Sequence, residues 1–264
     1  MLIEFNKYQG AGNDFIVIDN RKSMVRANNH DLFAGLCNRR FGIGADGLIL
    51  IADHPELDFE MLYYNSDGKP GTMCGNGGRC AFAFCLKNGI AGDKSRFKAI
   101  DGVHRVCLNN DGTISLEMSD VKAPEIVGGN HFLDTGSPHY IIAVPDVDSV
   151  NVGERGRNIR KSAQFSPGGT NVNFVEFRDN GIKIRTYERG VEAETLACGT
   201  GITAAAISSR WGKAEGRQSV DVEARGGKLN VQFSLDTMAA RSVVLTGPAK
   251  FVYKGEFDTE MIIH

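Results

Sequence analysis

The stretch Cys74-Gly75-Asn76-Gly77 recurs later in this chain as Cys198-Gly199-Thr200-Gly201. Each copy is a cysteine followed by Gly-x-Gly and then by an alanine-containing apolar run that is typical of a helix. Two more pairs of similar segments lie at nearly the same offset, 98–102 with 223–227 and 10–15 with 136–141. A period this long indicates a duplicated domain and not a solenoid repeat.

The pattern around each copy predicts one long helix embedded among many strands. We expect the two long helices at 78–87 and 201–210, and a shorter helix at 31–39 near Asn29. Alternating and β-branched runs predict strands at 2–7, 15–19, 48–52, 59–64, 95–100, 103–108 and 113–118, then at 140–144, 173–177, 182–186, 219–223, 228–233 and 242–246. The predicted fold class is therefore α+β, with two pseudosymmetric duplicated domains, each a curved mixed or antiparallel sheet wrapped around a central helix.

The domain boundary is expected near 121–124, where a strand ends in a Pro-containing connector. Residues 1–120 then form the N-terminal domain and 121–250 the C-terminal domain. The second domain is complete before the last strand, at 250–257. We therefore expect 251–264 to return to the first domain.

Composition narrows the class of partner. The 264 residues carry a formal net charge of −2 with interspersed signs, which offers no electrostatic surface for nucleic acid or membrane. A small-molecule substrate is expected. The N-terminus lacks the pattern of a signal peptide, and no run reaches the ~20 apolar residues of a membrane span, which predicts a cytoplasmic protein with reduced thiols. Four of the six cysteines lie in apolar or helical contexts typical of small buried hydrophobes: Cys37, Cys80, Cys85 and Cys107.

The two remaining cysteines are placed for acid–base chemistry. A helix N-terminus stabilises a thiolate and lowers a cysteine pKa from about 8.5 to as little as ~3.5. The following glycines would let a carboxylate approach the same backbone N–H groups. One thiolate that removes a proton from a carbon and one thiol that returns a proton on the opposite face would invert that carbon. Cys74 and Cys198 thus indicate a racemase or epimerase whose two thiols titrate as a pair.

Other interpretations remain open on the residues alone. The Cys-Gly-x-Gly turns could be scaffolding in a non-catalytic amino-acid-binding protein. A disulfide between Cys74 and Cys198 is geometrically conceivable but disfavoured in a reducing compartment. A thiol redox protein is disfavoured because the chain has no Cys-x-x-Cys spacing. No lysine stands in a context that supports a Schiff base.

The ordered set of motifs resembles the diaminopimelate epimerase family, whose members act without a cofactor. The segments that carry the resemblance are 10–15, 41–47, 64–68, 73–80, 171–174, 188–190, 194–201 and 247–249. The resemblance implies interconversion of LL- and meso-diaminopimelate in lysine and peptidoglycan-precursor synthesis, with no metal or organic cofactor. A related racemase acting on another amino acid is the nearest alternative.

The resemblance also implies site residues. It implies an acid–base pair with two assisting side chains, and a set of substrate ligands: Cys74, Cys198, Glu188 and His139 for the first, and Asn13, Asn65, Gly75, Asn76, Asn171, Arg189, Gly199 and Thr200 for the second. Two positions depart from the family pattern, Ser137 where an asparagine is common and Gly47 where some members carry glutamine. The segment 247–253 resembles one whose tyrosine lies at a dimer interface, so a homodimer is expected.

Overall fold

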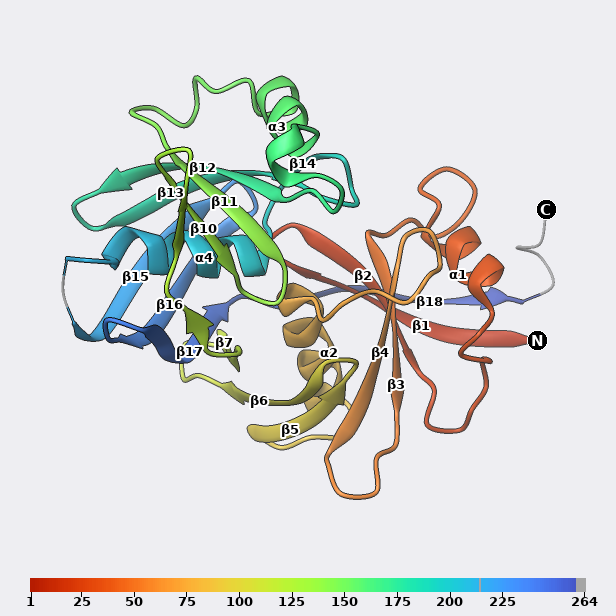
Figure 1. The fold of residues 1–264 in the computed structure, drawn as a ribbon. Helices are drawn as coiled ribbons and strands as arrows, with labels where there is room; N and C mark the ends of the chain where they lie inside the picture. Colours follow the sequence, from red (N-terminus) through yellow and green to blue (C-terminus); the bar gives the residue numbers. More distant parts are fainter. Residues whose placement is uncertain (214, 260–264) are drawn as a thin grey trace. The chain divides into compact units, whose positions relative to one another are not determined.

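The computed structural model describes residues 1–213 and 215–259. The chain forms two compact units (Figure 1), unit 1 from Met1–Leu116 and Pro248–His264 and unit 2 from Glu117–Gly247. Each unit is a mixed sheet that packs against a long helix, so the predicted fold class is confirmed. No helix in the described part of the chain is long and apolar enough to cross a membrane.

The sheet of unit 1 includes both the first and the last strand of the chain. Its strands are β1 (Leu2–Gly10), β2 (Asn13–Asp19), β3 (Gly47–Ala52), β4 (Phe59–Asn65), β5 (Lys94–Ala99), β6 (Gly102–Leu108), β7 (Ile114–Glu117), which reaches the unit boundary, and β18 (Lys250–Asp258). Strand β1 pairs antiparallel with both β18 and β2, β2 pairs parallel with β3, and β4 pairs parallel with β5. The remaining pairs, β3–β4, β5–β6 and β6–β7, are antiparallel.

The helix α2 (Gly75–Lys87) contacts β1, β2, β3, β4 and β18, and the short α1 (His30–Cys37) covers β3. Nearly every side chain of α2 as far as Cys85 is buried, as expected for a helix enclosed by a sheet. The structure corrects one prediction here, because α2 begins at Gly75 and not at 78. Burial of the whole first turn outweighs the cost of about 1 kcal/mol that each glycine carries in a helix.

Unit 2 repeats the plan around α4 (Gly199–Arg210), which contacts β10 to β13 and β15 to β17. Its strands are β8 (Val121–Lys122), β9 (Glu125–Val127), β10 (Asn130–Asp134), β11 (Pro138–Ala143), β12 (Asn171–Arg178), β13 (Gly181–Glu188), β14 (Ala193–Thr195), β15 (Gly216–Ala224), β16 (Gly227–Leu235) and β17 (Ala239–Gly247). Strand β11 is parallel to β12, and β13 is parallel to β15, while β12 and β13 are antiparallel. Helix α4 begins at Gly199, two residues before the predicted start.

Several elements were not predicted from the sequence: α3 (Val152–Arg160), the 3-10 turn η1 (Ala163–Phe165) and the short strands β8, β9, β10 and β14. In α3 only Val152 and Gly156 are buried, so no apolar stripe marks the helix. Gly156 is needed for close packing, because a Cβ there would lie 2.3 Å from the Cβ of Tyr187. A glycine that resembles a helix breaker in sequence is therefore a contact point in the fold.

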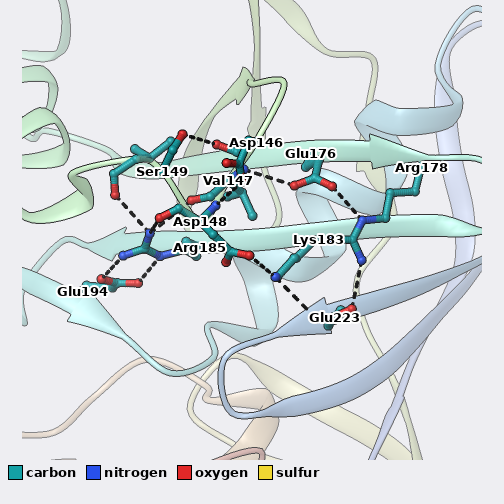
Figure 2. A network of polar contacts seen from close by, with 11 residues as sticks. Asp146, Val147, Asp148, Ser149, Glu176, Arg178, Lys183, Arg185, Glu194 and Glu223 are labelled. Carbon is teal, nitrogen blue, oxygen red and sulfur yellow. Dashed lines mark hydrogen bonds and ion pairs between the residues drawn. The ribbon is translucent and has the colours of Figure 1, made fainter.

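A polar network fixes the segment before α3 to the sheet of unit 2 (Figure 2). Arg185 of β13 pairs with Glu194 of β14 through two bonds of 2.7 and 2.8 Å, and its Nη1 donates to the carbonyls of Val147, Asp148 and Val150. Lys183 of the same strand pairs with Asp148 and Glu223. The network therefore joins β13, β14 and β15 to residues 147–150.

Candidate active site

Cys74 is the N-cap residue of α2. Its backbone is extended (φ −105°, ψ 115°), and its side chain makes no capping hydrogen bond to the helix. The sulfur is therefore left for other partners at the positive end of the helix dipole. It is half-buried, whereas Gly75 and Asn76, the next two residues, are buried.

Asn13 is a polar partner that the fold brings to Cys74. The two-residue turn of Ala11 and Gly12, with φ of 52° and 83°, closes the β1–β2 hairpin and sets Asn13 at the start of β2. The Oδ1 of Asn13 accepts from the Cys74 thiol at 3.6 Å and from Asn76 Nδ2 at 3.4 Å. Its Nδ2 donates to Asp46 at 2.7 Å. Because a carboxylate only accepts, Asp46 fixes which end of the Asn13 amide faces Cys74.

The anchor of Asn13 belongs to a charged cluster. Arg39 bridges Asp14 and Asp46 with distances of 2.6 and 2.7 Å, and Lys7 pairs with Asp14 at 2.8 Å. Burial disfavours the ionised form of Asp14, but the bonds from Arg39 and Lys7 outweigh it and lower the pKa of Asp14 to about 2. Asp14 is therefore ionised at neutral pH, and Arg39 joins it to Asp46, the acceptor of the Asn13 amide.

Arg79 of helix α2 is fully buried. Its Nη2 donates to Asn76 Oδ1 at 2.6 Å and its Nε donates to the carbonyl of Pro248 at 3.4 Å, while Nη1 has no hydrogen-bond partner among the described residues. Burial lowers the pKa of Arg79, and the nearby Cys80 and Cys74 oppose that shift. Burial raises the pKa of Cys80 far above its ordinary value, so Cys80 stays neutral. The positive charge of Arg79 therefore favours the thiolate of Cys74.

Cys198 occupies the matching place in unit 2. It is the N-cap of α4 with nearly the same backbone (φ −109°, ψ 110°), and only 8% of it is exposed. Its sulfur lies 3.4 Å from Thr200 Oγ1. Thr200 Oγ1 lies 2.9 Å from His139 Nε2, and the Thr200 carbonyl accepts from Thr135 at 2.9 Å.

His139 lies on β11 with no exposed surface. Burial lowers its pKa from 6.5 to about 3, so the ring is neutral at physiological pH. A histidine with this pKa accepts a proton poorly. What it offers to Thr200 is a hydrogen bond.

Asn171 is 3% exposed and joins two other predicted residues. Its Nδ2 donates to Ser137 Oγ and to the Pro138 carbonyl, both at 2.8 Å, and its Oδ1 accepts from the backbone N–H of Arg189 at 2.9 Å. Ser137, where an amide is common in the resembling family, is therefore an acceptor for Asn171. The Arg189 guanidinium is half-exposed and makes a longer bond of 3.4 Å to the carbonyl of Gly168.

Glu188 is the last residue of β13, and it accepts a hydrogen bond from Thr195 Oγ1 at 2.8 Å. Thr195 lies three positions before Cys198 in the sequence. In unit 1, Asn65 ends β4 with its side chain exposed. Gly47 is explained by packing, because a Cβ there would lie 2.5 Å from the Tyr63 ring. Tyr63 fills the space that a longer side chain at 47 would need.

Each unit thus gathers its own set of predicted residues. Unit 1 brings together Cys74, Gly75, Asn76 and Asn13, and unit 2 brings together Cys198, Gly199, Thr200 and His139. Asn65, at the exposed end of β4, is not joined to the first set by these bonds. The described part of the chain holds no group of three or more His, Cys, Asp or Glu side chains that could bind a metal ion.

Asn173 Nδ2 lies 3.1 Å from His139 Nδ1, and Thr186 Oγ1 donates to Asn173 Oδ1 at 2.9 Å. Four supporting residues of these sets were not predicted from the sequence: Arg79, Asp46, Asn173 and Thr186. A signal existed for two of them. Asn173 follows Asn171 by two positions and so shares its strand face, and Arg79 lies one turn after Asn76 on the same helix face.

Comparison with known proteins agrees with these features. The family model described as diaminopimelate epimerase matches residues 5–123 and 131–252. A diaminopimelate epimerase of Flavobacterium psychrophilum is 46% identical over 249 residues, 94% of this chain and 97% of that protein. One of Aquifex aeolicus is 42% identical over 280 residues, 98% of this chain and 99% of that protein.

Solved structures share the fold at low identity. A phenazine biosynthesis protein of the PhzF family from Bacillus anthracis has a TM-score of 0.77 at 13% identity, covering 97% of this chain and 99% of that one. A hydroxyproline epimerase from Agrobacterium vitis, solved with trans-4-hydroxy-L-proline bound, has a TM-score of 0.67 at 13% identity, covering 97% and 92%. At this identity the likeness shows the fold alone.

Proposed function

Because the chain belongs to the diaminopimelate epimerase family, we propose that it interconverts the LL and meso isomers of diaminopimelate by proton transfer at one α-carbon. The observation that carries the proposal is the pair of cysteines at the N-caps of two duplicated helices, with nearly identical backbone angles. This reaction serves lysine and peptidoglycan-precursor synthesis in the family.

In this proposal one cysteine starts as a thiolate and the other as a thiol. The thiolate takes the α-proton, so that an S–H bond forms while the C–H bond breaks. The electron pair is delocalised into the α-carboxylate, whose growing charge is met by backbone N–H groups of the helix N-termini. The other thiol then gives its proton to the opposite face of the carbon and becomes the thiolate. No electron acceptor, metal or organic cofactor is needed for this balance.

We assign the reacting carboxylate to Gly75 and Asn76 of one helix and to Gly199 and Thr200 of the other. Gly75, Asn76 and Gly199 are buried at the first helical turns and Thr200 is half-buried, which supports this assignment because a bound carboxylate would be largely desolvated there. The second amino-carboxylate group of the substrate is assigned to the remaining predicted ligands, Asn13, Asn65, Asn171 and Arg189. The bonds of Asn171 to Ser137 and Arg189 support a second role for Asn171 beside contact with the substrate, which is to hold these two neighbours in place. Glu188 and His139 are assigned assisting roles beside Cys198.

The test is isotopic. Purified protein is incubated with LL-diaminopimelate in deuterated water without added cofactor, and the meso product should carry deuterium at the inverted α-carbon. Cys74→Ser and Cys198→Ser should each abolish epimerisation and leave the fold intact. Cys107→Ser is the matched control, because Cys107 lies on β6 and is not an N-cap of either helix. Near-normal turnover in either of the first two variants would contradict the two-base reaction, as would activity on proline or histidine but not on diaminopimelate.

We also propose a cytoplasmic homodimer. The large apolar residues Phe251, Val252 and Tyr253 of β18 are 41 to 52% exposed, which supports a protein contact on this strand. Sedimentation equilibrium should give a dimer for the native chain and a monomer for Tyr253→Asp. A native monomer at micromolar concentration contradicts this part.

A further inference from the structure

A chain of hydrogen bonds runs from β13 through β12 and β11 to the sulfur of Cys198. Thr186 Oγ1 lies 2.9 Å from Asn173 Oδ1, and Asn173 Nδ2 lies 3.1 Å from His139 Nδ1. The bonds from His139 to Thr200 and from Thr200 to Cys198, described above, complete the chain. Asn173 and His139 have no exposed surface, and Thr186 has 3%, so water does not compete for the bonds among these three residues. Thr200, at the end of the chain of bonds, is half-buried.

The direction of each bond follows from one backbone carbonyl. Asn173 Nδ2 lies 3.3 Å from the carbonyl oxygen of Tyr140, which can only accept. The group that faces Tyr140 must therefore be the NH₂ end of the amide. That same NH₂ group faces His139 Nδ1, so Nδ1 is an acceptor and carries no proton. The Oδ1 end then accepts from the Thr186 hydroxyl.

This places the single proton of the neutral His139 ring on Nε2. A second proton on Nδ1 would point at the Asn173 NH₂ group, which opposes the imidazolium form independently of burial. His139 Nε2–H then donates to Thr200 Oγ1. The hydroxyl proton of Thr200 is left for its other contact, the sulfur of Cys198.

Gly201 makes room for this arrangement. A Cβ at 201 would lie 2.5 Å from Asn173 Oδ1 and 3.2 Å from His139 Cε1 and Nδ1. The second glycine of the Cys198 motif is therefore required by the His139–Asn173 pair.

We infer that Asn173 is a positioning residue that holds His139 as the neutral Nε2–H tautomer, so that the Thr200 hydroxyl donates to the Cys198 thiolate. His139 is then a hydrogen-bond donor that supports proton transfer at Cys198 and does not act as its base. The inference rests on the proposed function for its purpose, but its atoms are tested without substrate. The elements around His139 carry these charged and titratable groups: His131 and Asp134 on β10, Tyr140 on β11, Glu176 and Arg178 on β12, Lys183, Arg185, Tyr187 and Glu188 on β13, Cys198 and Arg210 at the two ends of α4, and Arg189 directly after β13. The charge of Arg189 adds to burial in lowering the pKa of His139.

The tautomer is tested by ¹⁵N NMR of histidine-labelled protein, with the His139 signals assigned by their loss in His139→Gln. Native His139 should show a protonated Nε2 and a bare Nδ1 from pH 5 to pH 8. Asn173→Asp presents a carboxylate to Nδ1 and should make Nδ1 protonated within that range. A native Nδ1–H tautomer, a native titration near pH 6.5, or an unchanged ring in Asn173→Asp would each overturn the inference.

The effect on sulfur is tested by the pH dependence of iodoacetamide alkylation of Cys198 in a Cys74→Ser background. Thr200→Val removes the hydroxyl and should slow alkylation at neutral pH about tenfold by raising the thiol pKa, the effect of one lost hydrogen bond to a charged group. Thr200→Ser keeps the hydroxyl and should restore the native profile. In a Cys198→Ser background the same variants should leave Cys74 unchanged.

An equal Cys198 profile in Thr200→Val and the native protein would also overturn the inference. These readings are independent of turnover. If the NMR or alkylation test fails while deuterium exchange into diaminopimelate is intact, only the role of the hydrogen-bond chain is rejected. If the NMR and alkylation results are as expected but no deuterium is exchanged, only the proposed function is rejected.

Discussion

At the scale of single residues, the two cysteine motifs are alike in sequence and different in surroundings. The Cys74 side relies on a buried guanidinium group, that of Arg79, which donates to Asn76. The Cys198 side relies on a neutral ring, His139, which contacts Thr200. Asn76 and Thr200 hold the same position in the two motifs, so duplication preserved the cysteines while their supports diverged.

The second glycine of each motif gives a matched pair of substitutions. Gly201→Ala should destabilise the protein by about 1–3 kcal/mol, because the new methyl overlaps Asn173 Oδ1 at 2.5 Å in a packed interior. Gly77→Ala should be neutral or slightly stabilising, because its nearest contact is the mobile end of Met61 at 3.3 Å and alanine favours helix. Urea unfolding of both variants measures the difference. Equal loss of stability would contradict the crowding described at Gly201.

His139 also makes stability depend on pH. Burial lowers its pKa in the folded protein from 6.5 to about 3, so below pH 6.5 the unfolded chain binds a proton that the folded chain does not. The stabilisation from the neutral ring is therefore complete above pH 6.5 and is lost as the pH falls toward 3. Its contribution should decline by up to about 1.4 kcal/mol per pH unit.

Unfolding of His139→Gln should show a flatter pH dependence than the native protein between pH 6.5 and 4. His54→Asn, in the loop between β3 and β4, is the control and should keep the native slope. An identical slope in His139→Gln would mean that this ring does not stay neutral in the fold.

At the scale of elements, apolar runs predicted most strands and both long helices, because these elements bury a face and their patterns show it. The helix starts were misplaced for a physical reason, since Gly75 and Gly199 have poor helix propensity and are kept helical by tertiary burial. Cys74 and Cys198 could be predicted because cysteine, a reactive residue, occurs twice before the same Gly-x-Gly pattern. Arg79 and Asn173 were missed because their importance lies in which buried partner they meet across strands, and a sequence pattern does not specify that.

Helix α3 is the element with the weakest sequence signal. The network of Figure 2 holds residues 147–150, which precede this helix, so a substitution in the network tests how the segment is held. Arg185→Met removes the pair with Glu194 and the donors to three carbonyls, at a site where both charged side chains are 15% exposed. It should cost about 1–3 kcal/mol and raise hydrogen exchange in residues 147–160.

The control is Arg178→Met in the same network, where the side chain is 42% exposed and pairs with Glu176 and Glu223. Exposed pairs contribute little, so stability and exchange should stay near native values. Similar effects of the two variants would show that the buried carbonyl contacts are not what holds this segment.

At the scale of the whole molecule, the two units differ in how the chain builds them. Unit 2 is one continuous segment, Glu117–Gly247, whereas unit 1 needs both ends of the chain. Strand β18 returns to pair with β1 from Leu2↔Asp258 to Gln9↔Lys250, and the Met1 amino group bonds Asp258 at 2.8 Å. The α2 contacts include β18 as well, and Arg79 reaches the Pro248 carbonyl. A core built this way is incomplete until the last strand is present.

This chain path predicts which fragments fold. A fragment of residues 117–247 should give a cooperative unfolding transition by circular dichroism, because α4 and every strand that it contacts lie inside it. A fragment of residues 1–116 should lack such a transition, since β1 loses the partner that covers one of its edges and α2 loses part of its packing. Joining 1–116 to 248–264 through a flexible glycine–serine linker supplies β18 and should restore the transition. The decisive comparison is between the two unit 1 fragments, because cooperative folding of 1–116 alone would show that β18 is dispensable and that the return of the chain does not complete the unit.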